Sequence, residues 1–481
     1  MAEISDVLFR EYDIRGTYGA DLTPEVAELI GRAYAVYARR AGTWKPGARL
    51  TVTVGRDVRL SSNALRDALI AGLTESGIDC VDLGECPTPL QYFSMHHLGD
   101  KVGGGVMITG SHNPPEYNGF KVSVGKETIH GSEIQESKKI IRTGLGKPGG
   151  VTPGKVESYD VITDYIGTVT RGFDLPRLPR PIKVVLDSGN GTAGPVAPAL
   201  LRGLGCEVVE LFSSPDGRFP NHHPDPTIPK NLQHLIDAVR KNGADFGVAY
   251  DGDADRIGAV DEAGGIIWGD KLMVIFSRAI LSDAPGATIV GEVKCSQVMY
   301  DEIAKAGGVP VMWKTGHSLI KARMKELGAA MAGEMSGHIF FADRYYGFDD
   351  AIYASARLVE IIGRKRAKDP GYRFSSLLSG VPETVVTPEI RIECADDMKF
   401  QVIERLDAAI GPGGELRVRD VVRIDGLRIN FDGGWALVRA SNTQPVLVMR
   451  FEAASEALID AAKRFVKARM REAAPSLAVN I

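Results

Sequence analysis

One unit recurs three times along this chain: an apolar segment, a polar turn containing glycine, an amphipathic helix, a glycine, and a second apolar segment. This order is typical of a right-handed βαβ crossover, which joins two parallel strands and spans about 30 residues. Three widely separated copies predict three related α/β domains. The expected units cover residues 50–83, 182–211 and 288–313.

The C-terminal hundred residues break this pattern. Residues 426–431 alternate between polar and apolar, Asp-Gly-Gly at 432–434 favours a hairpin, and 435–438 and 446–451 are expected to be strands. A closing helix is expected from Ser455 to Ala473, because its apolar residues fall on one face. This part is therefore predicted to be an antiparallel sheet with helices packed on it.

A chain of 481 residues is too long for a single hydrophobic core. Linker-like stretches occur at Gly144–Gly154, Asp261–Gly265 and Lys368–Gly371. We therefore expect the α/β fold class: three related mixed α/β domains, each containing a βαβ unit, followed by an antiparallel α+β domain. The expected domains are 1–157, 158–263, 264–370 and 371–481.

Composition excludes several classes of protein. Hydrophobic residues at 44%, charged residues at 25% and a net charge of −4 are ordinary globular values without the basic excess of a nucleic-acid-binding protein. Five scattered cysteines without a CxxC pair indicate reduced thiols in the cytoplasm. We expect no signal peptide, no membrane span and no nucleic-acid partner.

The loop Thr109–Lys121 is the first candidate for chemistry. It follows an apolar strand end, and its Gly-Ser-His turn and two prolines deny the chain regular hydrogen bonds. Such a loop fixes Ser111 at a strand end, where α/β folds place their reactive groups. With His112 beside it and Lys121 ten residues later, the hydroxyl suits phosphorylation or nucleophilic attack. A proline-rich turn with a surface serine is the alternative.

The loop Asp251–Arg256 is the second candidate, and it follows an expected strand, Phe246–Tyr250. Alternate carboxylates on an extended loop point to one side and give oxygen ligands for a hard divalent cation, which predicts a Mg²⁺ site at Asp251, Asp253 and Asp255. Glu262 falls where an EF-hand has its last ligand, but Arg256 occupies the position that needs glycine. A solvated acidic loop is the other alternative.

A phosphoserine at Ser111 would link these two loops. Three carboxylate oxygens leave a Mg²⁺ shell incomplete, and Mg²⁺ in proteins usually completes its shell with phosphate. The ion would then polarise the phosphoryl group for transfer. The loop Thr109–Lys121 would therefore supply the phosphate that the metal site lacks, and Asp251–Arg256 would supply the ion that the phosphate needs. Ser111 is thus expected to be a metal ligand through its phosphate.

Two further loops carry polar groups suited to a sugar phosphate. In Gly333–His338, the alternating Glu334, Ser336 and His338 would face one side and could grip vicinal hydroxyls; a simple turn before a strand is the alternative. Arg439–Gln444 offers a guanidinium, hydroxyls, an amide and free N–H groups, which suit a phosphate; a polar hairpin loop is the alternative.

Together these loops resemble the α-D-phosphohexomutase superfamily, and most closely its bacterial phosphomannomutase/phosphoglucomutase branch. Four loops match in the expected order, Thr109–Lys121, Asp251–Arg256, Gly333–His338 and Arg439–Pro445, and similar stretches extend from Phe9 to Phe451. The resemblance implies four domains around one central cleft, each contributing a loop.

The resemblance also implies a role for each matching residue. Ser111 would carry the phosphate, with Arg15, Lys121 and His112 in charge stabilisation or proton transfer. Asp251, Asp253 and Asp255 would hold Mg²⁺. The residues expected to bind substrate are Tyr12, Arg256, Lys294, His317, Glu334, Met335, Ser336, Gly337, His338, Arg439, Ser441, Asn442 and Thr443.

The central residue of Gly333–His338, the predicted sugar loop, indicates which sugar the chain would accept. Met335 resembles the residue of the dual mannose/glucose enzymes, whereas glucose-restricted relatives tend to have Glu there and glucosamine-phosphate mutases Gln. Methionine offers no hydrogen bond that could select between 2-epimers. Asn442-Thr443 differs from the Gly-Thr usual in glucosamine mutases, and Gln444 departs from the Glu of many relatives.

The resemblance therefore implies reversible conversion of mannose 6-phosphate to mannose 1-phosphate, and likewise for glucose. The cofactors would be Mg²⁺ and a glucose or mannose 1,6-bisphosphate that acts as intermediate and activator. A monomer or weak oligomer is expected. The alternatives are a mutase restricted to glucosamine or glucose phosphates, a Mg²⁺-dependent sugar phosphatase with Ser111 as nucleophile, and a non-catalytic sugar-phosphate sensor.

Overall fold

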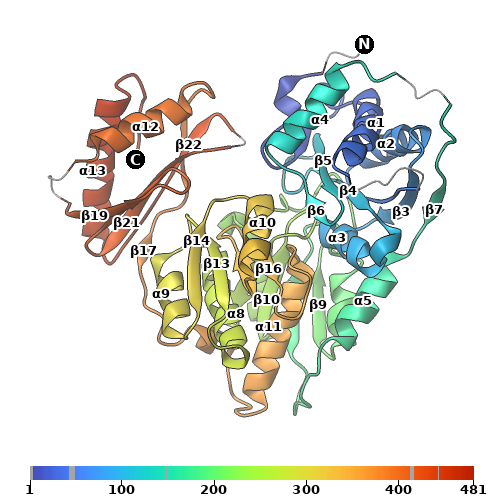
Figure 1. Cartoon of the computed structure of the whole chain (residues 1–481). Coiled ribbons are helices and arrows are strands. Elements are labelled where there is room, and N and C mark those ends of the chain that lie inside the picture. The colour runs from blue at the N-terminus through green and yellow to red at the C-terminus, as the bar shows by residue number, and fades with distance from the viewer. Residues whose placement is uncertain (1–3, 43–48, 147–149, 412–415, 443) are drawn as a thin grey trace.

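The computed structural model describes residues 4–42, 49–146, 150–411, 416–442 and 444–481. It has four separate sheets, each formed by a successive part of the chain (Figure 1). In Figure 1 the N-terminal sheet lies at the upper right, the C-terminal sheet at the upper left, and the two middle sheets below them. The first three sheets mix parallel and antiparallel pairs, and the last is antiparallel. The predicted fold class is confirmed.

The first sheet has the order β1-β5-β4-β2-β3-β7, with β6 paired to β5. Its strands are β1 (Ile14–Thr17), β2 (Thr51–Arg56), β3 (Asp79–Glu85), β4 (Gly104–Ile108), β5 (Tyr117–Val124), β6 (Glu127–Thr128) and β7 (Val156–Ser158). Its helices are α1 (Pro24–Arg40), α2 (Ser62–Glu75), α3 (Thr88–His97) and α4 (Ser132–Arg142), with 3₁₀ turns at Asp6–Leu8 and Gly99–Lys101. The first expected βαβ unit is present, because β2 and β3 run parallel on either side of α2 in the chain.

The second sheet has the order β12-β11-β10-β8-β9. Its strands are β8 (Lys183–Asp187), β9 (Glu207–Leu211), β10 (Phe246–Tyr250), β11 (Ile257–Asp261) and β12 (Ile266–Ile267). Its helices are α5 (Val161–Arg171), α6 (Ala197–Gly203) and α7 (Gln233–Asn242), with a 3₁₀ turn at Pro229–Leu232. Helix α7 ends at Gly243, whose φ of 56° is the left-handed conformation that glycine adopts without strain.

The third sheet has the order β14-β13-β15-β16. Its strands are β13 (Thr288–Glu292), β14 (Val309–Trp313), β15 (Met331–Gly333) and β16 (Ile339–Phe341). Its helices are α8 (Gly269–Asp283), α9 (Gln297–Lys305), α10 (His317–Leu327) and α11 (Ala351–Arg366), with a 3₁₀ turn at Phe374–Leu378. The parallel pairs β8–β9 and β13–β14 are the other two expected βαβ units.

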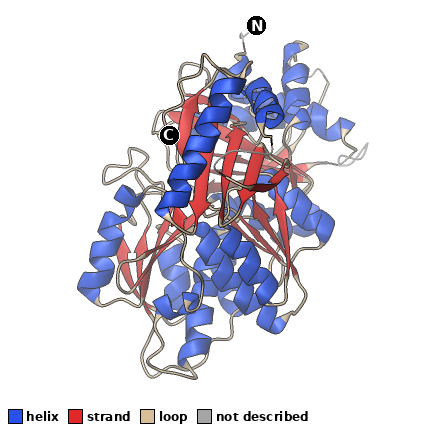
Figure 2. Cartoon of the chain, turned by 90° about the vertical axis from the view of Figure 1, so that its left-hand side faces the viewer, coloured by secondary structure: helices blue, strands red, loops and turns tan. Residues whose placement is uncertain are grey.

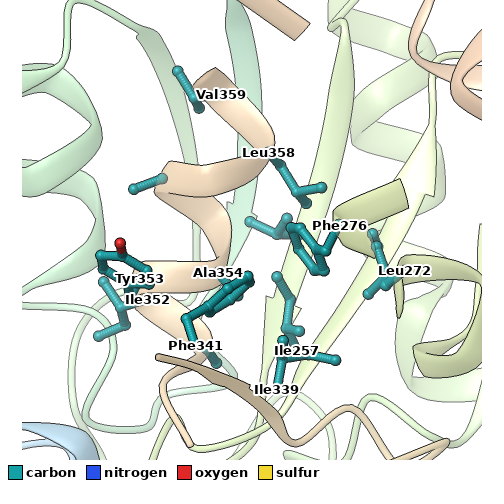
Figure 3. Close-up of a cluster of buried hydrophobic side chains, with 14 of the residues drawn as sticks. Ile257, Leu272, Phe276, Ile339, Phe341, Ile352, Tyr353, Ala354, Leu358 and Val359 are labelled. Carbon is teal, nitrogen blue, oxygen red and sulfur yellow. The ribbon is translucent and has the colours of Figure 1, made fainter. Parts of the chain in front are cut away.

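Helix α11 joins the second and third sheets into one core. Its two middle turns are buried on every side, so polar residues have no solvent-facing stripe there. Figure 3 shows Leu358 and Ala354 of this helix beside Phe276 of α8 and Phe341 of β16, with Ile257 of β11 below them. A shared apolar core of this kind fixes β11 and β16, which follow the loops Asp251–Arg256 and Gly333–His338, relative to each other.

The C-terminal sheet has the order β17-β22-β21-β20-β19, with β18 paired to β22. Its strands are β17 (Val385–Val386), β18 (Ile390–Glu393), β19 (Val418–Val422), β20 (Leu427–Phe431), β21 (Gly434–Ala440) and β22 (Val446–Ala453). Helices α12 (Lys399–Ala409) and α13 (Glu456–Ala473) share one apolar core with the sheet, and Figure 2 views the molecule from this side.

A buried arginine fastens this sheet to the third domain. Arg428 of β20 donates from Nη1 to the carbonyl oxygens of Val293 (2.6 Å) and Cys295 (2.8 Å), and from Nη2 to Gln297 Oε1 (3.2 Å). Its guanidinium lies 3.9 Å from the ring centroid of Trp435. The segment that follows β13 is therefore held by the C-terminal domain.

Among the described residues, no helix has the length and apolarity needed to cross a membrane.

Candidate active site

The serine loop connects β4 to β5 and holds Ser111 in an unusual backbone conformation. Ser111 has a φ of 50°, a left-handed value that is uncommon for a residue with a side chain. Its N–H donates to Thr109 Oγ1 (2.8 Å), and its Oγ donates to Asp251 Oδ2 (3.0 Å) and lies 3.1 Å from His112 Nδ1. The structure therefore brings the serine and the aspartate loop into direct contact.

The aspartate loop connects β10 to β11 within an antiparallel pair, which excludes an EF-hand because no helix precedes it. Asp251, Asp253 and Asp255 are fully buried, and one oxygen of each lies within 4.8 Å of the others. Oδ1 of Asp253 and Oδ1 of Asp255 have no hydrogen-bond partner. Buried oxygens without a partner are costly unless a cation takes them, so this donor set fits Mg²⁺.

Lys121 of β5 balances part of this negative charge. Its Nζ donates to Asp253 Oδ2 (2.9 Å) and to Asp255 Oδ2, and its side chain is 3% exposed. Burial alone would lower the pKa of Lys121, but the two carboxylates outweigh it and raise this pKa well above its ordinary value. Burial, together with repulsion from Asp255 and Asp253, raises the pKa of Asp251 well above its usual range.

His112, next to Ser111 in the chain, has a lowered pKa, in contrast to the raised pKa of Lys121. Burial lowers the pKa of His112 well below its ordinary value, and the cationic side chains of Arg256 and Arg15 lower it further. His112 is therefore neutral near pH 7, beside the serine. Arg15 pairs with Asp13 and donates to Asn113 Oδ1 (3.3 Å), so it lies along the same loop.

The sugar loop contacts the aspartate loop directly. Arg256 Nε donates to His338 Nε2 (2.9 Å), and the two residues form an isolated β-bridge. Glu334 accepts from Gly316 N–H (2.7 Å) and from Ser336 Oγ (3.1 Å). These hydrogen bonds fix the side chains of Glu334, Ser336 and His338 in place.

The backbone of Gly337 and the contacts of Met335 fix the shape of the rest of this loop. Gly337 has a φ of 96°, and a Cβ there would lie 2.3 Å from the carbonyl oxygen of Ile257, so only glycine fits. Met335 is partly buried, and its N–H donates to Glu292 Oε1 (3.3 Å).

The predicted phosphate loop, Arg439–Gln444, connects β21 to β22 and reaches the first domain. Asn442 Nδ2 donates to Tyr12 Oη (2.6 Å), and Tyr12 Oη donates to the carbonyl oxygen of Thr315 (2.7 Å). Arg439 is 5% exposed and donates from Nε to Asp425 Oδ2 (3.0 Å). Ser441 Oγ accepts from the N–H of Gln444 (3.2 Å), and predicted residue 443 lies outside the described residues.

Two further predicted residues come from the third domain. Lys294 Nζ lies 3.6 Å from Glu389 Oε2, and attraction to Glu292 and Glu389 outweighs burial, which raises the pKa of Lys294. Burial lowers the pKa of His317 well below its ordinary value, and Lys321 acts in the same direction. The His317 ring stacks on His338 with centroids 5.8 Å apart, which joins this loop to the sugar loop.

Several supporting acids escaped the sequence reasoning. Asp349 lies 3.1 Å from His338 Nδ1 and 3.4 Å from Lys321 Nζ, and Asp425 accepts from Thr315 N–H (3.0 Å). Strand β16 separates Asp349 from His338 in the chain, and Asp425 and Thr315 belong to different domains, so no local pattern reveals these pairs. Glu292 is the last residue of β13, and the sequence marks this strand end only by its Gly-Glu-Val-Lys composition.

Comparisons with known proteins agree with this geometry. Family models described as phosphoglucomutase/phosphomannomutase, alpha/beta/alpha domains I, II and III, match residues 6–143, 163–265 and 268–379, and the C-terminal domain model matches 389–468. A phosphomannomutase/phosphoglucomutase of Pseudomonas aeruginosa is 45% identical over 474 residues, which is 98% of this chain and 97% of that protein.

Two further relatives show the same extent of similarity. A phosphoglucomutase of Neisseria meningitidis is 43% identical over 472 residues, with 97% of each chain covered. The crystal structure of a phosphoglucomutase/phosphomannomutase family protein from Burkholderia thailandensis superposes with a TM-score of 0.90 at 42% identity, and covers 100% of both chains. With all four domain models matched in order, the chain belongs to the phosphoglucomutase/phosphomannomutase family, within the α-D-phosphohexomutase superfamily.

Proposed function

We propose that this chain is a phosphomannomutase/phosphoglucomutase, an isomerase that interconverts mannose 6-phosphate with mannose 1-phosphate and glucose 6-phosphate with glucose 1-phosphate. The observation that carries the proposal is the hydrogen bond of Ser111 Oγ to Asp251, inside a site that four domains build. The names of relatives at 43–45% identity over nearly the whole chain support it.

Ser111 carries a phosphoryl group in the working enzyme. In the first step the bond from phosphorus to Ser111 Oγ breaks and a bond to the free sugar hydroxyl forms, which gives a 1,6-bisphosphohexose. The hydroxyl proton passes to the neutral imidazole of His112, which lies 3.1 Å from Oγ, and His112 returns a proton to Ser111 Oγ as the serine leaves as a hydroxyl. In the second step the bisphosphohexose, turned over in the site, returns its other phosphoryl group to Ser111.

The charged residues of the loop prepare this transfer. Asp251, Asp253 and Asp255, with the phosphate on Ser111, would hold Mg²⁺, which neutralises negative charge on the phosphoryl oxygens when bound. Lys121 stays protonated beside these carboxylates, and Arg15 adds a second cation. These cations stabilise charge that spreads over the oxygens during transfer.

The remaining residues bind the sugar and its second phosphate. Glu334, Ser336 and His338 face the hydroxyls, with the loop turned by Gly337, while Arg256, Lys294, His317 and Tyr12 line the approach. Arg439, Ser441, Asn442 and Thr443 take the distal phosphate, from either end of the hexose. Met335 presents a thioether that does not distinguish 2-epimers by hydrogen bonding, so both sugars are substrates.

The proposal extends to the cellular setting. A hexose 1,6-bisphosphate phosphorylates enzyme that has lost its phosphate and so acts as activator. All five cysteines are buried free thiols, which suits a reducing cytoplasm. The enzyme works as a monomer or weak oligomer without a nucleic-acid or membrane partner. The proposed domain boundaries are 1–157, 158–263, 264–370 and 371–481.

A coupled assay tests the function. Mannose 1-phosphate and glucose 1-phosphate are each converted to the 6-phosphate with Mg²⁺, with and without glucose 1,6-bisphosphate, and intact mass is recorded before and after. We expect turnover that rises with the bisphosphate, and one added phosphoryl group that Ser111→Ala abolishes together with activity. Release of inorganic phosphate without need for a bisphosphate would show a phosphatase instead, and unchanged turnover of Ser111→Ala would exclude a serine carrier.

A further inference from the structure

A buried ion pair lies beneath the serine loop. Asp57 and Arg59 belong to the turn between β2 and α2, and their side chains are 1% and 0% exposed. The Arg59 Nε donates to Asp57 Oδ2 (3.1 Å). An ion pair that is removed from water survives only when its remaining donors and acceptors are satisfied, so its other contacts show what it holds.

All five N–H groups of the Arg59 side chain have an acceptor, and four of those acceptors belong to the serine loop. Besides Asp57, the guanidinium donates to the carbonyl oxygens of Ser111 (2.8 Å), Asn113 (2.5 Å), Tyr117 (2.9 Å) and Pro114. A guanidinium has five donors in a fixed planar fork, whereas an ammonium has three without a fork. The loop is therefore wrapped around one arginine side chain.

Asp57 holds the beginning of the same loop. Its Oδ2 accepts from the N–H of Gly110 (3.0 Å), and its Oδ1 accepts from the N–H of Arg59 (3.0 Å) and from Ser62 Oγ (2.6 Å). The carboxylate thus binds the residue before Ser111 and the arginine that binds the residues after it. Asp57 thus fixes the backbone before Ser111, and Arg59 fixes the backbone at Ser111 and after it.

The space around the guanidinium is filled. A Cβ at Gly110 would lie 2.5 Å from Arg59 Cζ, so the loop passes too close to the arginine for any side chain there. On the side of the second domain, Phe219 places its ring centroid 5.3 Å from Arg59 Cζ. The guanidinium therefore has little freedom to move, and neither does the loop that it binds.

The contacts of Asp57 and Arg59 surround Ser111, whose backbone conformation is strained. A left-handed φ of 50° at Ser111 is strained for a residue with a side chain and persists only when surrounding contacts enforce it. The carbonyl of Ser111 is bound by Arg59, and the N–H of Ser111 is bound by Thr109. With both sides of the residue fixed, its Oγ points at Asp251.

We propose that Arg59, held by Asp57, is a positioning residue that keeps Ser111 in the conformation needed for phosphoryl transfer. This inference rests on the proposed function, because it assigns the pair to the phosphate-carrying serine. Arg59 binds the backbone of the serine loop and thereby aligns Ser111. The phosphoryl group on Ser111 is therefore aligned both when it leaves the serine and when the serine is phosphorylated again.

Arg59→Lys tests the inference, because it keeps the charge and loses the fork. We expect kcat to fall about 100-fold, the loss typical of a misplacement near 1 Å, with KM changed by less than about threefold. The rate at which glucose 1,6-bisphosphate phosphorylates Ser111, followed by intact mass, should fall by the same factor. Asp57→Asn, which leaves Arg59 in place, should show the same division between kcat and KM.

The chain offers a matched control in Arg366, at the far end of β10 from the aspartate loop. Its guanidinium is also buried, pairs with Asp245 (2.6 Å) and donates from Nε to the carbonyl oxygen of Tyr372 (3.0 Å). Arg366→Lys should lower Tm with kcat unchanged. If Arg59→Lys and Asp57→Asn behave like this control, or if neither variant folds, the pair is merely structural. A wild-type enzyme without mutase activity would instead overturn the proposed function.

Discussion

Replacing Lys121 by methionine should reveal how the aspartate loop balances its charge. The ammonium is 3% exposed and lies 2.9 Å from Asp253 Oδ2, with Asp255 bonded on its other side. At an effective dielectric constant of 20, one such pair is worth about 6 kcal/mol before the cost of burying both ions. Removing one partner of a buried ion pair costs about 3–5 kcal/mol net.

The variant should therefore be unstable without a divalent cation and should bind one more tightly. In EDTA we expect Tm to fall by about 10 °C, the shift that 3–5 kcal/mol produces in a domain of this size. By isothermal titration calorimetry the Kd for Mg²⁺ should tighten at least about tenfold, because Asp253 and Asp255 no longer share their oxygens with an ammonium. Saturating Mg²⁺ should then restore most of the lost Tm.

Lys321→Met is the matched control. The Lys321 side chain is 14% exposed, and its carboxylate partner is Asp349, at 3.4 Å, outside the three aspartates of the aspartate loop. This variant should lose Tm and keep its Mg²⁺ affinity. The reasoning fails if Lys121→Met leaves the Kd for Mg²⁺ unchanged while Tm falls equally in EDTA and in Mg²⁺.

Two further predictions concern the frame around the site. Arg428→Met leaves two carbonyls and an amide unpaired, so we expect a loss of about 2–3 kcal/mol and an earlier calorimetric transition, lower by about 10 °C, for the C-terminal domain; an unchanged scan would contradict the docking role. Burial raises the pKa of Asp350 to about 6 from an ordinary 3.8, so its folded form gains about 1.4 kcal/mol per pH unit as pH falls from 6 toward 4. The stability of wild type relative to Asp350→Asn, measured by Tm, should therefore rise over that range, and a flat difference would refute it.

Local patterns predicted the parts of this fold whose signals are local. Each βαβ unit carries its own periodicity and turn residues, and the structure places parallel strands within the expected units. The closing helix was expected at 455–473, and α13 runs from Glu456 to Ala473 with Ser455 as its N-cap. Two-residue strands such as β6 and β17 were not foreseen, because a period of two needs a longer run to be visible.

The candidate loops were predictable because glycine, proline and clustered charge mark them. Their supports were not, because they act across long distances in the chain: Asp425 reaches Thr315, and Arg59 reaches the carbonyls of Ser111 and Tyr117. For the unit 50–83 the sequence predicts only a polar turn after the first strand, since nothing local shows that Arg59 lies inside the protein. Burial of a charged residue is decided by its distant partners.

The lysine of β5 has a consequence for the modular appearance of the chain. Repeated βαβ units suggest interchangeable parts that could be cut out and studied separately. Lys121 belongs to the first domain, yet its anionic partners Asp253 and Asp255 belong to the second. An excised first domain would keep a lysine without a counterion in its sheet, and in an excised second domain Asp253 and Asp255 would lack their lysine. The repeats are therefore similar in topology but electrostatically inseparable.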